Sequence, residues 1–334
     1  MPSERRHAVK LFRSRSAGTE SLRLYYASDI HGADVCWRKF LGAAEHYGAD
    51  ATMLGGDLTG KAIVPISETG ASFTAVFMGE EWHGSTPIEL EQLEAAIRFN
   101  GMYPWLAQSS EVDRHRSDAA AQAELFDRVI ISELQRWVDL ADQRMVARRI
   151  PIFVIPGNDD LWACDAVLRN STSLTFADDC VIPWEGHEVL SLSYSNLTPW
   201  KSRRELDEDS LYHRLRALAD QLENPEAAIF NLHVPPYDTG IDAACEVNPE
   251  DLSLVYASGK PHIIPVGSRA VRQVIEEVQP MLSLHGHVHE SRGEARLGRT
   301  LALNAGSEYN SGHLQGVLVS IAGTQVKSHQ FVVG

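Results

Sequence analysis

Residues 22–32, with the sequence LRLYYASDIHG, place an apolar run directly before a short polar turn. The run from Leu22 to Ala27 is short and rich in aromatic and aliphatic residues, which predicts a buried strand. From Trp37 to Tyr47, apolar residues recur every three or four positions, which predicts a helix with one buried face. Ala51 to Leu54 then predicts the next strand. This β-α-β order indicates an α/β fold with parallel strands.

The alternation of apolar runs and helical patterns continues along the chain. Further strands are expected at residues 152–155, 189–194, 227–232 and 281–284, and antiparallel edge strands at 300–303, 317–321 and 326–333. Between residues 71 and 149 the apolar spacing predicts helices. We therefore expect a single domain, 1–334, with a helical insertion at 71–149 that caps one end of the sheet. Trp105 and Trp137 follow the helical stripes of this insertion, so we expect them to pack in the core rather than bind a ligand.

The composition is that of an acidic globular protein. The chain has 334 residues, of which 44% are hydrophobic, and a formal net charge of −15. This charge argues against nucleic acid or an anionic membrane as a partner. The four cysteines form no CxxC pair, which excludes the usual zinc-finger and thioredoxin-like spacings.

The sequence also predicts where the protein resides. Its first twenty residues hold five basic residues without an apolar segment, which argues against a signal peptide: Arg5, Arg6, Lys10, Arg13 and Arg15. No apolar run approaches the roughly 18 residues that a membrane span requires. We therefore expect a soluble, cytoplasmic protein.

Five of the expected strands are each followed by residues that commonly bind metals. The five motifs are SDIHG (28–32), GGD (55–57), PGNDD (156–160), HVPP (233–236) and HGHVH (285–289). In open α/β sheets, ligands bind beyond the carboxyl ends of the strands, where these loops would converge. Each motif alone is weak evidence, because Asp, Asn and Gly are also ordinary turn residues. The order of all five is specific.

That order resembles the calcineurin-like metallophosphoesterase superfamily, whose motifs are DxH, GGD, GN-x-D, a lone His and GHxH. The resemblance covers the chain from about Leu22 to Ser307 without the insertion, and NAGS at 304–307 is similar to the closing turn of that family. The stretches GGDLTGKAIVPI and VGSRAVRQVIEEVQPMLSLHGHVHES further resemble predicted phosphoesterases related to the bacterial cyclic-nucleotide phosphodiesterase branch. The resemblance implies a four-layer α/β/β/α sandwich of metallophosphoesterase type.

The resemblance also implies a site for two divalent metal ions. One ion would be bound by Asp29, His31, Asp57 and His289, and the second by Asp57, Asn158, His233 and His287, with Asp57 bridging the two. These are oxygen and nitrogen donors, which suit Mn, the expected metal, as well as Fe, Zn, Co or Ni. The implied reaction is metal-assisted hydrolysis, in which a bridging hydroxide attacks phosphorus.

The sequence departs from the family pattern at Asp159, where members commonly carry a histidine that can protonate the leaving group. At its ordinary pKa near 3.9, only about one aspartate in a thousand is protonated at neutral pH. We therefore expect a catalytic set of Asp57, Asn158 and Asp159 that favours phosphodiesters or anhydrides with good leaving groups over alkyl monoesters.

Two further residues near the motifs have competing interpretations. His285 is either a support or substrate contact, or a buried strand-end histidine with a backbone partner. Lys61 could reach a phosphate, although a solvated loop lysine is the simpler interpretation.

The leading functional hypothesis is a dinuclear phosphohydrolase, specifically a phosphodiesterase acting on a small or nucleotide-like substrate. The alternatives are a phosphomonoesterase or nucleotide pyrophosphatase, and a non-catalytic scaffold that retains the fold. A nuclease would have to hold a polyanion, which the charge of −15 opposes. A scaffold would be expected to lose ligands, whereas every expected ligand position is filled.

Overall fold

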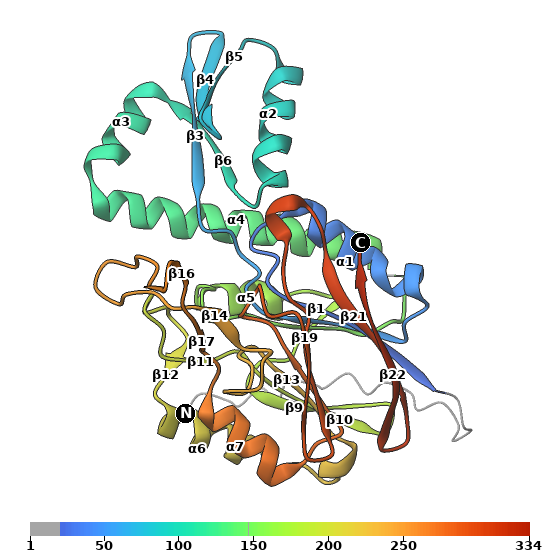
Figure 1. Cartoon of the computed structure of the whole chain (residues 1–334). Coiled ribbons are helices and arrows are strands. Elements are labelled where there is room, and N and C mark those ends of the chain that lie inside the picture. Colours follow the sequence, from blue (N-terminus) through green and yellow to red (C-terminus); the bar gives the residue numbers. More distant parts are fainter. Residues whose placement is uncertain (1–20, 146) are drawn as a thin grey trace, which may run out of the picture.

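The computed structural model describes residues 21–145 and 147–334. Within these residues, two six-stranded sheets form the centre of the molecule (Figure 1). The first sheet has the order β22 (Gln325–Val333), β21 (Gln315–Ala322), β1 (Leu22–Ala27), β2 (Ala51–Gly55), β7 (Ile152–Ile155) and β8 (Leu174–Phe176). The second has the order β19 (Gly293–Leu297), β20 (Thr300–Asn304), β18 (Leu282–His285), β13 (Ile229–Leu232), β10 (His187–Leu192) and β9 (Cys180–Trp184).

Alternation of side chains on the strands produces four layers. On β1, Leu24 and Tyr26 belong to the apolar core between the two sheets, whereas Tyr25 and Ala27 belong to the core beneath the helices. That outer core is covered by α1 (Asp34–Tyr47), α4 (Ala119–Met145) and α5 (Cys164–Arg169). The far side of the second sheet is covered by α6 (Glu208–Ala219) and α7 (Arg269–Val278), which lie at the bottom of Figure 1. The predicted four-layer α/β/β/α sandwich is confirmed.

The sequence predicted the central strands well and the C-terminal strands less well. Strand β20 is not an antiparallel edge strand, because it runs parallel to β18 and lies inside the sheet, with β19 as the edge. All five residues of β20 are buried, and a continuous buried run is typical of an interior parallel strand. Strands β21 and β22 are antiparallel as expected, but only β22 lies at the edge, because β21 also pairs with β1.

The segment 71–149 is not purely helical, and this corrects the prediction. It contains β4 (Ser72–Phe77), β5 (Glu80–Gly84) and β6 (Tyr103–Gln108), which form a four-stranded sheet with β3 (Ile63–Thr69). The buried residues Phe73, Ala75 and Phe77 alternate with exposed ones, a period of two that the search for helical spacing missed. Helices α2 (Pro87–Phe99) and α3 (Ser109–Ser117) complete this insertion, together with the long α4.

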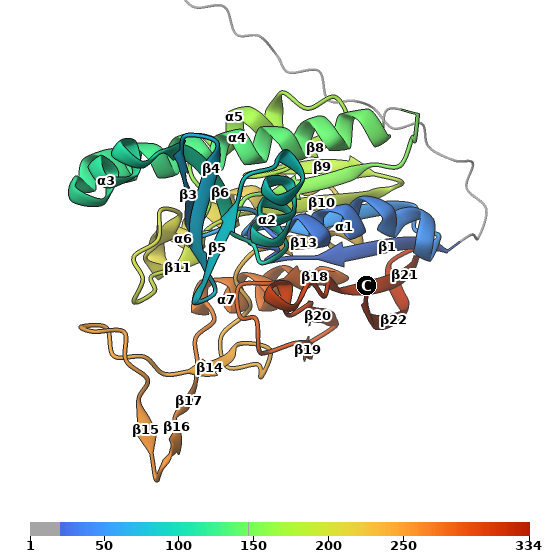
Figure 2. The ribbon, with the colours of Figure 1, turned by 90° about the horizontal axis from the view of Figure 1, so that it is seen from above.

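The insertion stands on the first sheet's helical side, with α4 running between it and the core (Figure 1). Trp137 of α4 packs in the core as predicted, stacking on Trp37 with ring centroids 5.2 Å apart. The smaller two-stranded pairs are β11 (Ser195–Asn196) with β12 (Glu205–Leu206), β14 (Ala243–Cys245) with β17 (Ile263–Pro265), and β15 (Tyr256–Ala257) with β16 (Lys260–Pro261). In Figure 2, β15 and β16 project away from the sandwich.

Across the described residues, no helix combines the length and apolar character needed to cross a bilayer. The basic residues between positions 5 and 15, on which the signal-peptide expectation rests, lie outside the described residues.

Candidate metal centre

The five motifs meet at the carboxyl ends of five parallel strands. Asp29 and His31 follow β1, Asp57 follows β2 and Asn158 follows β7, all in the first sheet. The second sheet contributes three histidines, which follow β13 and β18: His233, His287 and His289. The site therefore lies where the ends of both sheets face each other, as the sequence predicted from the strand exits.

The backbone of these turns is held in an unusual conformation. Asp29, His31, Asp57 and His287 have φ angles of 56°, 38°, 49° and 66°. Non-glycine residues in this left-handed region are strained by about 1–3 kcal/mol each, and such strain gathers at functional sites. Neighbouring glycines allow the turns to approach closely. A Cβ on Gly157 would lie 2.1 Å from Asp57 Oδ1, and one on Gly286 would lie 2.1 Å from Asp29 Oδ2.

One half of the site is formed by Asp29, His31 and His289. Their ligand atoms all lie within 4.8 Å of one another. The Nε2 atoms of His31 and His289 are 3.1 Å apart, and His289 Nε2 lies 3.5 Å from Asp29 Oδ1. Asp29 is in turn oriented by the backbone N–H of His287, which donates to its carboxylate at 2.9 Å.

The other half is formed around Asn158, whose Oδ1 lies 2.9 Å from both His233 Nε2 and His287 Nδ1. His233 Nδ1 faces the carbonyl oxygen of Gly55 at 2.8 Å, which favours the tautomer that donates from Nδ1. In that tautomer His233 Nε2 carries a lone pair directed at the Asn158 oxygen. Two lone pairs directed at each other require a proton or a cation between them. This donor set therefore fits a metal ion.

Asp57 lies between the two halves. Its Oδ2 is 3.6 Å from His31 Nε2, and its Oδ1 is 3.6 Å from His233 Nε2. The two oxygens of one carboxylate thus face histidines from different halves of the site, the arrangement that a bridging ligand needs.

The pKa values of the acidic groups respond to this crowding. Burial raises the pKa of Asp57 to about 6, although His233 opposes the shift. Burial acts in the same direction on Asp29, but the hydrogen bond and charge of His289 outweigh it and hold the pKa of Asp29 well below its usual range.

The histidines divide into two groups. Burial lowers the pKa of His31 to about 3 and that of His287 to about 3, so both rings are neutral at pH 7, as metal binding requires. Burial opposes charge on His233 as well, but Asp57 raises its pKa to about 9. His233 therefore carries a second proton at neutral pH, and a bound cation would take the place of that proton.

Asp159 forms a separate group at the edge of the site with Lys61 and Ser202. The Lys61 ammonium pairs with the Asp159 carboxylate, and Ser202 Oγ donates to it at 2.5 Å. The backbone N–H of Asp159 donates to Asp57 Oδ1 at 3.1 Å. Burial would raise the pKa of Asp159, but Lys61 and Ser202 lower it to about 2, so this carboxylate is ionised at neutral pH. Lys61 is therefore not a purely solvated lysine, as the simpler interpretation held.

Two buried residues that are not proposed ligands, His285 and Arg204, contact the backbone of the loops that carry the ligands. His285 is fully buried, with its Nδ1 2.9 Å from the carbonyl oxygen of Val234, and therefore fixes the backbone next to His233. Arg204 is also fully buried. Its backbone N–H donates to the carbonyl oxygen of Asn158 at 3.2 Å, and its guanidinium pairs with Asp165 at 2.5 Å.

Sequence reasoning missed Ser202, Arg204 and Tyr309 as neighbours of the site. Tyr309 packs against His31 with ring centroids 4.8 Å apart. Ser202 and Arg204 lie in an irregular loop without periodicity, so no sequence signal indicated them. The closing turn NAGS gave a partial signal for Tyr309, which follows it by two residues. The last residue of this turn is Ser307, and its Oγ donates to the carbonyl oxygen of Asp29 at 2.6 Å, so the turn lies at the site.

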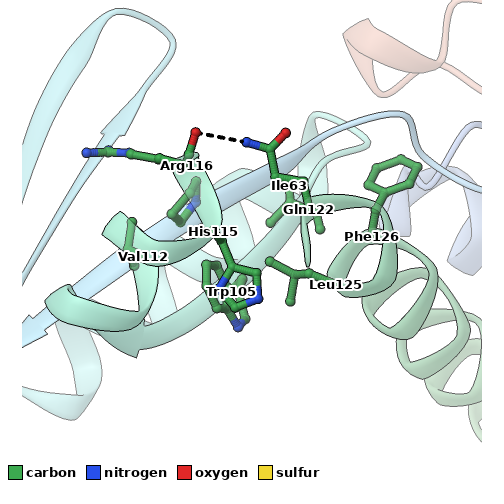
Figure 3. Close-up of a pocket in the computed structure, with 9 residues that line it drawn as sticks. Ile63, Trp105, Val112, His115, Arg116, Gln122, Leu125 and Phe126 are labelled. Atoms are coloured by element: carbon green, nitrogen blue, oxygen red, sulfur yellow. Dashed lines mark hydrogen bonds between the residues drawn. The ribbon is translucent and has the colours of Figure 1, made fainter. Parts of the chain in front are cut away.

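A pocket of about 260 Å³ lies in the insertion, between β3, β6, α3 and α4 (Figure 3). Trp105 and His115 pack edge to face in its wall, with ring centroids 5.0 Å apart. Trp105 is half-buried and lines this pocket, so it differs from Trp137, which packs wholly in the core. Ile63 also lines it, two residues along the chain from Lys61.

No protein-family model matches the sequence. The uncharacterised protein MJ1162 of Methanocaldococcus jannaschii is 28% identical over 177 residues, which cover 52% of this chain and 69% of that protein. One solved crystal structure superposes with a TM-score of 0.55 at 13% identity, covering 94% of this chain and 99% of the other. The crystal structure of TT1561 of Thermus thermophilus gives a TM-score of 0.51 at 14% identity, covering 91% and 99%.

These likenesses show the fold. The chain thus shares the architecture of solved structures, and it gathers at one end of that architecture the side chains by which its sequence resembles the calcineurin-like metallophosphoesterases.

Proposed function

We propose that this protein is a metal-dependent phosphoric ester hydrolase. The observation that carries the proposal is the convergence of seven oxygen and nitrogen donors from five separate loops. These donors belong to Asp29, His31, Asp57, Asn158, His233, His287 and His289. Such a cluster of buried histidines and carboxylates is unfavourable unless a cation compensates it.

The geometry supports two ions rather than one. Asp29, His31 and His289 would hold the first, and Asn158, His233 and His287 the second. Asp57 would contribute one oxygen to each, because its two oxygens face different histidines. The donor set has carboxylate, amide and imidazole groups and no thiolate, which suits Mn, Fe, Zn, Co or Ni, and we propose Mn as the ion.

When bound, a pair of divalent ions lowers the pKa of coordinated water and neutralises phosphoryl oxygens. The chain's own residues set the remaining conditions. Asp29 and Asp57 are carboxylates that would balance part of the metal charge, and His31 and His287 are neutral. The site would then carry a small net positive charge, which favours a single phosphoryl group although the molecule as a whole has a charge of −15.

We infer that diesters with good leaving groups are the preferred substrates. Asp159 is ionised and already accepts a hydrogen bond from Ser202, so it holds no proton to give to a leaving oxygen. A leaving group that departs as a stable anion avoids that need. Within this class we propose a small or nucleotide-like phosphodiester as the substrate.

The test is a hydrolysis panel with the Mn-loaded protein. Bis(p-nitrophenyl) phosphate, p-nitrophenyl phosphate and a set of nucleotides are compared for wild type, Asp57→Asn and the surface control Asp113→Asn. We expect wild type and the control to hydrolyse both p-nitrophenyl esters, which share a good leaving group, and Asp57→Asn to lose at least about 100-fold in activity. Undiminished activity in Asp57→Asn would reject the assigned site. Absence of both bound metal and activity in wild type would favour the scaffold.

A further inference from the structure

Lys61 presents a cation at the entrance of the metal centre. Its side chain is 55% exposed, whereas the Asp159 carboxylate with which it pairs is 24% exposed. One Asp159 oxygen lies within 4.8 Å of the ligand atoms of both His31 and Asp57. The ammonium group therefore extends toward solvent beside the place where a phosphoryl group would meet the site.

The loop that carries Lys61 is fixed by contacts of the two residues just before it. Asp160 accepts hydrogen bonds from Thr59 N at 2.9 Å and Thr59 Oγ1 at 2.5 Å, and the Tyr103 hydroxyl lies 2.7 Å from Gly60 N, which donates to it. Gly60 also packs so tightly that a Cβ there would lie 2.2 Å from the carbonyl oxygen of Gly101. A lysine on a fixed backbone loses less freedom when it binds a ligand than one on a mobile loop.

The position of Lys61 beside Asp159 indicates what its charge does at the site. Among the described residues, Lys61 is the only cation within ion-pair distance of the Asp159 carboxylate. A bare carboxylate at the entrance would repel an approaching phosphoryl anion. Lys61 cancels that charge and leaves donors of its ammonium group for the incoming oxygen, because an ammonium group has three N–H donors.

We propose that Lys61 is a substrate-binding residue whose ammonium group, held by Asp159, donates a hydrogen bond to a phosphoryl oxygen of the bound ester. This inference rests on the proposed phosphohydrolase function and deepens it, since it names the part of the substrate that the residue recognises. Asp159 is then a positioning residue that acts through Lys61.

The experiment uses inorganic phosphate as the probe, titrated calorimetrically into the Mn-loaded full chain, together with kcat and KM for bis(p-nitrophenyl) phosphate. The variants are Lys61→Met, Lys61→Arg and the double variant Lys61→Met with Asp159→Asn. Lys327→Met is the control, because Lys327 lies on β22 and its Nζ donates to Gln325. Mn affinity is measured for every variant.

We expect Lys61→Met to raise the phosphate Kd and the KM at least about tenfold without changing Mn affinity, the loss of one charge-assisted hydrogen bond. Lys61→Arg should stay within about threefold of wild type because it keeps the charge. The double variant should recover only the part of the loss that comes from repulsion by the unpaired carboxylate, because it still lacks the ammonium donor. The effect of Lys61→Met should also shrink at high salt.

The inference is overturned if Lys61→Met binds phosphate as tightly as wild type while both hydrolyse the diester. It is also overturned if Lys61→Arg loses as much affinity as Lys61→Met. If the Mn-loaded wild type neither binds phosphate nor hydrolyses the diester, the proposed function itself fails, and this outcome is distinct from the first two.

Discussion

The buried carboxylate of Asp160 accepts hydrogen bonds from both the backbone N–H and the hydroxyl of Thr59, 101 residues away along the chain. It also accepts from the N–H groups of Leu58 at 3.0 Å and Gly157 at 2.8 Å. Asp160 thereby joins the loop that carries Asp57 to the loop that carries Asn158. This carboxylate therefore helps to fix the spacing between these two proposed metal ligands.

Asp160→Asn should therefore destabilise the protein although it preserves shape. The new amide would direct N–H groups at backbone N–H donors, so at least one buried donor would lose its acceptor. We expect the free energy of unfolding to fall by about 2–3 kcal/mol, measured by urea denaturation. Asp113→Asn, at a position where the carboxylate is 73% exposed, should change it by less than about 0.5 kcal/mol. Equal effects of the two variants would contradict this role for Asp160.

The pH dependence of stability should change in Asp178→Asn. Burial raises the pKa of Asp178 to about 6, although Ser193 and Arg204 oppose the shift, whereas the unfolded chain has a pKa near 3.9. Between these values the folded protein keeps a proton that the unfolded chain has released. The contribution of Asp178 to stability is therefore complete below about pH 4 and is lost as the pH rises through 6.

The measurement is the free energy of unfolding of wild type and Asp178→Asn from pH 4 to pH 7. We expect the variant to gain about 2–3 kcal/mol relative to wild type over that range, because it has no proton to lose. Two parallel curves would show that Asp178 does not titrate in this window.

Asp159→His should shift the substrate preference toward monoesters with poor leaving groups. A histidine at this position can carry a proton at neutral pH and give it to the departing oxygen, which the ionised aspartate cannot do. The ratio of kcat/KM for an alkyl monoester to that for p-nitrophenyl phosphate, whose leaving group needs no proton, should rise at least about tenfold relative to wild type. An unchanged ratio would show that leaving-group protonation does not determine the preference.

The sequence predicted the core of the fold because its signals are local. Leu22 to Ala27 and Ala51 to Leu54 are short buried runs, and each ends directly at a motif, so both the strands and the edge where their loops meet could be inferred. The strands of the insertion were missed because helical spacing was sought across a segment in which Phe73, Ala75 and Phe77 follow a period of two.

The candidate site was predictable only where a motif follows a strand. The order of the motifs indicated the seven proposed ligands, and the structure places these residues side by side. The ion pair between Lys61 and Asp159 joins residues 98 positions apart, and Ser202 lies a further 43 positions along the chain from Asp159. Contacts between irregular loops depend on the packing of the whole sandwich, so no spacing in the sequence could predict them.

The most direct test of the central claim is the number of Mn ions that the chain binds, measured by calorimetric titration of the metal-free protein and checked by elemental analysis. The account predicts two ions per wild-type chain and no more than one in Asp57→Asn, because the two oxygens of Asp57 face histidines of different halves of the site. Binding of two ions by Asp57→Asn with unchanged affinity, or no binding by wild type, would contradict it.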